Sequence, residues 1–360
     1  MQAQTEDDVR AWFADAWLQA AATPSLPGFR IELHVEYPPQ YTDEHLAALR
    51  RQAEGKPDHP NWTIIRAEER RRRQPFDASR ITIWTDDREG WRYSRSYLTS
   101  TTDKPSYIDA VVSDSVMWQL TPEELHVADS RDGTATGAHG DARLREGAMR
   151  TYLRELLLGR LGNGADNGFG PDGRIEVLPD GRWAAYVAHP ERGAHRFEGT
   201  WDASLGRGFV ETIEIVETPD EFAKFRGTRY EIAGWYFDDT AQRWLARTAS
   251  EISPDGVVDH KTVLDAVMSV TPDELDAVFA VPPVEGSDPV RGEVTFRSLY
   301  DHRPTALARH DLGPDRAIVG STDLSGASSF RRWRVGGWVL AGVLIAGFVW
   351  LRFRAACSSP

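Results

Sequence analysis

Hydrophobic and polar residues alternate strictly between Arg30 and Tyr37. Ile31, Leu33 and Val35 fall on one side of this stretch, and charged or histidine side chains fall on the other. Successive side chains of a strand point to opposite faces of a sheet, so the pattern predicts a half-buried strand with one face in water.

Comparable patterns recur roughly every ten residues and are separated by short polar turns, a spacing typical of an antiparallel meander. Further strands are expected at 62–69, 80–86, 91–98, 107–113, 116–120, 174–178, 182–188, 195–202, 208–217, 228–237, 242–252 and 257–270.

The stretch 5–20 follows a helical period instead. Val9, Trp12, Phe13 and Trp17 recur at helical spacing, and Thr5 precedes Asp8 by three residues, as in a capping box. We expect an amphipathic helix whose Trp12, Phe13 and Trp17 form a lid over the sheet. The remaining helices are expected at 41–52, 144–161 and 272–279, with glycine-rich loops at 128–143 and 162–173. The predicted fold class is α+β.

The region 282–330 loses periodicity and is rich in proline, glycine, serine and aspartate. It is interpreted as a mostly extended linker with one strand near 293–299. The predicted organisation is a β-rich domain at 1–281, this linker at 282–330, a membrane anchor at 331–354 and a short tail at 355–360.

The anchor is predicted from the stretch 335–351, which contains no charged residue and has arginines on both sides. As a helix it would be about 25 Å long, slightly shorter than a ~30 Å hydrocarbon core, and terminal tryptophans and arginines can span the difference. A buried core helix is the less favoured alternative. The residues expected to form the anchor are Trp338, Leu340, Leu344, Ile345, Phe348 and Trp350.

The composition and motifs of the chain argue against several classes of function. The net charge of −13 disfavours nucleic-acid binding, and Cys357, the sole cysteine, lies beyond the predicted anchor. The sequence contains no nucleophile elbow, phosphate loop or histidine spacing typical of a metal site. We therefore expect no metal, no cofactor and no catalysis. An enzyme remains an alternative that would need polar groups to converge in one pocket.

The order of elements resembles the periplasmic lipoprotein-carrier and lipoprotein-sorting superfamily. The similar segments are the opening helix before the first strand, Val116-Met117-Trp118 with Thr121-Pro122, and the closing run from Gly227 to Pro282. The resemblance implies a curved antiparallel sheet, an incomplete barrel, with helices on its concave side around a cavity for acyl chains. The predicted C-terminal transmembrane helix is a difference from this superfamily, because a soluble shuttle would not be anchored in a membrane.

The apolar strand faces are the candidate ligand surface. Burial of such side chains is favourable against either helices or lipid, and the pattern does not separate a plain core from a cavity. The inward residues are expected to be Ile31, Leu33, Val35, Ile81, Ile83, Phe209, Ile213, Tyr230, Ile232, Trp244 and Met268.

The predicted function is a membrane-anchored, non-catalytic binding protein of the bacterial cell envelope. Its expected partners are membrane lipid and either a lipoprotein or another envelope protein, and its oligomeric state is not predicted. The alternative is a sensing or protein-interaction module that uses the same sheet.

Two interpretations of the N-terminus place the body of the protein on opposite sides of the membrane. Met1-Gln2-Ala3-Gln4 has no basic-then-apolar leader, yet it looks like the remnant of a signal-peptidase site. An exported body is favoured over a cytoplasmic, tail-anchored one. The C-terminal stretch also resembles sorting signals that are removed during export.

Overall fold

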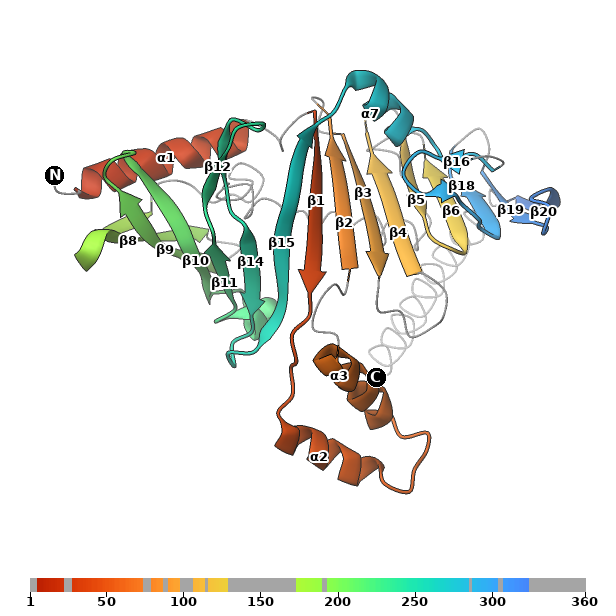
Figure 1. The fold of residues 1–360 in the computed structure, drawn as a ribbon, viewed down its shortest axis with the longest axis horizontal. Coiled ribbons are helices and arrows are strands. Elements are labelled where there is room, and N and C mark those ends of the chain that lie inside the picture. The colour runs from red at the N-terminus through yellow and green to blue at the C-terminus, as the bar shows by residue number, and fades with distance from the viewer. Residues whose placement is uncertain are drawn as a thin grey trace, which may run out of the picture.

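The computed structural model of the chain describes residues 5–22, 28–73, 79–86, 90–97, 106–113, 116–128, 173–189, 193–284, 287–303 and 307–323. The main element of this part of the chain is one large curved sheet, which is accompanied by a few helices (Figure 1). The described strands do not close into a barrel, because β20 and β7 form two separate edges.

The sheet contains sixteen strands in the order β20-β19-β18-β6-β5-β4-β3-β2-β1-β15-β14-β11-β10-β9-β8-β7. All neighbours are antiparallel except β6 and β18. The strands are β1 Phe29–Glu36, β2 Ser79–Thr85, β3 Trp91–Tyr97, β4 Ser106–Val112, β5 Met117–Leu120, β6 Glu124–Ala128, β7 Arg174–Val177, β8 Arg182–His189, β9 Gly193–Asp202, β10 Arg207–Glu217, β11 Arg229–Ala233, β14 Thr248–Ile252, β15 Val258–Ser269, β18 Ser298–Asp301, β19 Ala308–Leu312 and β20 Ile318–Asp323.

Two small hairpins supplement the sheet. They pair β12 Tyr236–Asp238 with β13 Arg243–Leu245, and β16 Ser287–Asp288 with β17 Gly292–Glu293.

The first predicted strand, β1, lies at the centre of the sheet between β2 and β15. Ile31 is directly opposite Ile83 on one side and Val267 on the other. The register therefore places the apolar residues of all three strands on the same face, as the alternating pattern predicts.

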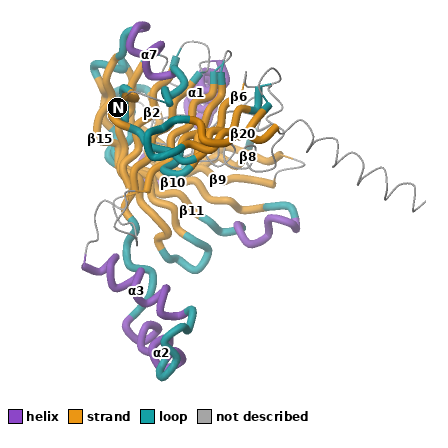
Figure 2. Tube along the Cα trace, turned by 90° about the vertical axis from the view of Figure 1, so that its right-hand side faces the viewer, coloured by secondary structure: helices purple, strands orange, loops and turns teal. Residues whose placement is uncertain are grey.

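Four α-helices are described. They are α1 Glu6–Ala22, α2 Asp43–Ala53, α3 Asn61–Arg73 and α7 Pro272–Phe279. Thr271 caps α7 through a full capping box with Glu274. Helices α2 and α3 pack on each other and project below the sheet (Figure 2).

The prediction of a strand at 62–69 is wrong, because this stretch lies within α3. Glu68 forms ion pairs with Arg71 and Arg72, one helical turn away, and is fully buried. The run of glutamate and arginine favours a helix both by propensity and by such pairs.

The prediction of a linker at 282–330 is wrong for residues 287–323, because these form β16 to β20. The pairing of β18 with β6 joins residues about 170 positions apart, as Tyr300 opposite His126 shows. Such long-range pairing leaves no local periodic signal in a polar strand.

Two other predicted elements lie outside the described residues. These are the helix at 144–161 and the membrane anchor at 331–354. Within the described part of the chain, no helix combines the length and apolarity needed to cross a bilayer.

Candidate functional site

The face of the sheet on which α1 packs is here named the inner face. It carries one continuous cluster of buried hydrophobic residues that runs from β7 and β8 through β10, β11, β14 and β15 to β1, β2 and β3. Antiparallel sheets commonly bury one face and leave the other in water. The opposite face is named the outer face.

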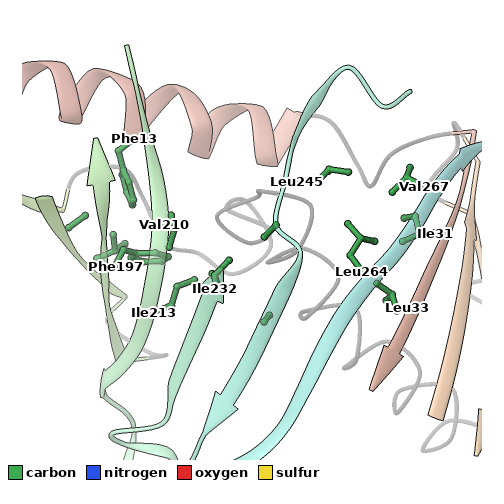
Figure 3. Packing of buried hydrophobic residues seen from close by; sticks show 14 of the residues in the cluster. Phe13, Ile31, Leu33, Phe197, Val210, Ile213, Ile232, Leu245, Leu264 and Val267 are labelled. Carbon is green, nitrogen blue, oxygen red and sulfur yellow. The ribbon is translucent and has the colours of Figure 1, made fainter. Parts of the chain in front are cut away.

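Helix α1 covers the part of the inner face formed by β7 to β10. Phe13 is completely buried, with its ring 6.0 Å from that of Trp183 and 5.5 Å from that of Phe197. Figure 3 shows Phe13 pointing from the helix toward Phe197 and Val210. Trp12 and Phe13 therefore pack on the sheet, and their role as a lid over a ligand site stays a prediction. The side chain of Trp17 lies outside the described residues.

Trp12 lies directly over the backbone of β10. A Cβ atom placed on Gly208 would come within 2.6 Å of the Trp12 ring, so glycine permits this close approach. Trp12 also meets Trp183 and Trp201 edge-to-face, at 5.2 and 6.2 Å. Arg10 adds a hydrogen bond to the carbonyl oxygen of Gly173, which fixes α1 beside β7.

The apolar surface continues well beyond α1. Leu245, Ala249 and Leu264 are completely buried, and Leu264 lies opposite Leu33. Figure 3 shows Leu264, Val267, Ile31 and Leu33 as a second group, away from Phe13.

Eight of the eleven predicted ligand residues lie on the inner face: Ile31, Leu33, Val35, Ile81, Ile83, Ile213, Tyr230 and Ile232. Tyr230 is partly buried and the other seven are buried. Whether they contact a ligand stays a prediction.

The other three predicted residues, Phe209, Trp244 and Met268, do not face this cluster. Phe209 follows Gly208, which faces α1, and packs against Trp244 with ring centroids 4.9 Å apart. Met268 is opposite Arg30, on the outer face.

Two β-bulges account for the placement of Phe209 and Met268. The register shifts between Val210 and Thr212 of β10, and again where Leu33 meets β15. The extra residue of a bulge shifts the alternation of side chains by one position. Two residues that lie four positions apart on either side of the bulge therefore point to opposite faces.

The inner face becomes polar near the ends of β1, β3, β14 and β15. Arg95, which is 1% exposed, donates a hydrogen bond to the Tyr37 hydroxyl at 2.8 Å. The Tyr37 ring lies 6.1 Å from that of His260, and His260 lies 3.8 Å from the carboxylate of Glu251. This group of four residues is named the polar end of the inner face.

Burial shifts the ionisation of two of these groups. It lowers the pKa of His260, with Asp259 opposing the shift and Arg95 adding to it. Burial also raises the pKa of Glu251, assisted by the charge of Asp259. Both shifts favour the neutral forms, as expected where water is scarce.

Sequence reasoning missed the polar end. The alternation in β3 places Arg95 on the same face as Tyr93, but an arginine on a strand normally indicates a solvent-exposed side. Its burial depends on β1 and β15, which lie far away in the sequence. Within the described part of the chain, no group of three metal-ligating side chains converges.

No family model and no curated protein sequence matches the chain. Among the solved structures that match, one is described as an outer membrane lipoprotein-sorting protein domain from Vibrio parahaemolyticus, with 7% identity and a TM-score of 0.34. The match covers 74% of this chain and 94% of that one.

Proposed function

We propose that the protein binds an acyl chain against the inner face of the sheet and catalyses no reaction. The observation that carries this proposal is the extent of the apolar inner face. The face reaches β1 and β2, beyond β7 and β10, which α1 contacts. Its side chains there are buried, so we place the acyl chain within this apolar layer and not on an open surface. Apolar area removed from water contributes about 25 cal/mol per Å², so a long acyl chain can gain substantial binding free energy on such a surface.

The polar end suggests where the ligand's head would lie. Arg95, Tyr37 and His260 supply hydrogen-bond donors beside the apolar residues Ile81 and Val35. An amphiphile could place its tail along the apolar strands and its head at these donors. Apolar sites with a few placed polar groups are typical of small-ligand binding.

The proposal also includes attachment to a bacterial envelope membrane through the stretch 335–351, with the body outside the cytoplasm. The attachment rests on the uncharged sequence and its flanking arginines. The placement of the body outside the cytoplasm rests on the resemblance of its element order to periplasmic lipoprotein-carrier proteins.

The test uses the full chain, solubilised in digitonin because this detergent lacks straight acyl chains. Solvent extraction followed by mass spectrometry should recover bound acyl lipid. Titration of the delipidated protein with a fluorescent fatty acid should saturate, and unlabelled palmitate should compete. Protein that carries no lipid and shows no saturable binding would contradict the proposal and favour a protein-interaction module.

A further inference from the structure

Arg207, at the start of β10, lies between aromatic rings on the outer face. Its guanidinium carbon is 4.9 Å from the centroid of Phe209 and 5.4 Å from that of Trp244. Trp244 in turn meets Phe237 at 5.8 Å between ring centroids. Arg207 alternates with Gly208, which faces Trp12, and this places the arginine on the face opposite α1.

This guanidinium has no acidic partner among the described residues. Asp202 lies directly opposite Arg207 in the strand register, but its carboxylate accepts hydrogen bonds from Ser204 and Leu205 in the turn. The Nε atom of Arg207 is buried and makes no hydrogen bond. Burial lowers the pKa of the group, and no charged neighbour contributes to the shift.

Neighbouring arginines behave differently. Arg182 pairs with Glu198 at 3.3 Å, and Arg229 pairs with Glu231 at 2.9 Å. The protein as a whole carries a net charge of −13, so acidic groups are abundant. A half-buried cation that contacts aromatic rings but has no acidic partner among the described residues can still bind an anion from outside.

We propose that Arg207 and the rings of Phe209 and Trp244 form a second binding site, which takes an oxyanion group such as a phosphate. A planar guanidinium offers paired N–H donors that match a phosphate or carboxylate in a two-pronged contact. The rings hold the guanidinium plane in place. Phe237 and Leu205, which are 44% and 49% exposed, supply apolar surface for the rest of the ligand.

This site lies on the outer face and is independent of acyl-chain binding on the inner face. The oxyanion could come from a soluble phosphate compound or from a phospholipid head group. Both sources share the chemistry that Arg207 recognises, and the experiment distinguishes them.

Isothermal titration calorimetry of the full chain in neutral detergent would use three probes: inorganic phosphate, phenyl phosphate and dihexanoyl phosphatidylglycerol below its micellar concentration. We expect one saturable site that depends on Arg207 and is better filled by phenyl phosphate than by inorganic phosphate. Arg207→Met should weaken binding by about tenfold or more, and Arg207→Lys should restore part of it. Binding by the phospholipid alone would assign the oxyanion to a lipid head group.

The matched control is Arg229→Met, which removes an arginine of the same sheet that already has a carboxylate partner. It should leave binding unchanged. Circular dichroism would verify that each variant is folded, and Trp244→Leu provides a second variant that removes one ring. Two results would overturn the proposal. One is equal binding by wild type and Arg207→Met. The other is no binding of any probe at millimolar concentration and about 10-fold molar excess, roughly the range of weak specific sites.

Discussion

Arg92 and Asp288 form a fully buried ion pair between residues that are far apart in the sequence. Arg92 lies on β3, and its two terminal nitrogens donate to the Asp288 carboxylate at 2.8 and 3.1 Å. The same guanidinium donates to the Val278 carbonyl and to Asp109, and it lies 4.8 Å from the Trp118 ring. Asp288 lies in β16, in the chain segment that follows α7, so the pair attaches this segment to the outer face of the sheet.

Replacing Arg92 with methionine should lower the free energy of unfolding by about 3–5 kcal/mol, because Asp288 would lose its buried partner. Urea unfolding monitored by circular dichroism measures this change. The control Arg229→Met breaks the exposed pair with Glu231 and should change stability by less than about 1 kcal/mol. A loss below about 1 kcal/mol for Arg92→Met would show that the buried pair does not hold this segment.

Gly208→Ala should destabilise the protein by about 1–3 kcal/mol, because its Cβ atom would collide with the Trp12 ring. The melting temperature is the measurement. The double variant Gly208→Ala with Trp12→Ala should lose less stability than the sum of the two single variants. The reason is that the added Cβ atom has no ring to collide with once Trp12 is replaced by alanine. Gly320→Ala is the matched control, because a Cβ atom there meets nothing closer than 3.8 Å. Additive effects would mean that Trp12 does not lie over β10 in solution.

The protein should lose stability as the pH falls from 7 to 5, in part through His195. Burial lowers the pKa of His195 from its ordinary value of 6.5 to about 4. Between these values the unfolded state binds a proton that the folded state excludes, so acid favours unfolding. The expected contribution at pH 5 is about 2 kcal/mol.

Urea titrations at pH 7 and pH 5 measure this loss. His195→Phe should reduce the difference between the two pH values, because phenylalanine does not titrate. An unchanged difference would assign the acid sensitivity to other groups, such as His260.

Leu344→Arg should release the protein from membranes. A charge at the centre of a bilayer costs about 2.5–3.5 kcal/mol on the scale derived from insertion experiments. Fractionation followed by an alkaline wash measures retention, and Leu344→Ile serves as the control. If the arginine variant stays in the membrane after the wash, the segment at 335–351 is not the anchor.

The sequence predicted the sheet best where alternation was regular and burial was one-sided. The strand around Ile31 and Leu33 and the helix around Phe13 both follow from local periodicity. The bulge in β10 reversed the face of Phe209, because its position depends on pairing with β9 and is invisible in a single strand. The polar end and the Arg92 pair arise from contacts between distant segments, which local patterns do not specify.

The central claim is that an acyl chain binds the inner face, and Ala249 offers the most direct test. Ala249 is completely buried in the apolar cluster on β14, whereas the adjacent Ser250 faces the other side. The measurement is the dissociation constant of a fluorescent fatty acid for the delipidated full chain. Ala249→Phe should weaken binding about tenfold or more by filling the site, while Ser250→Phe leaves it unchanged. Equal affinities for wild type and Ala249→Phe, with both proteins folded, would contradict the proposed site.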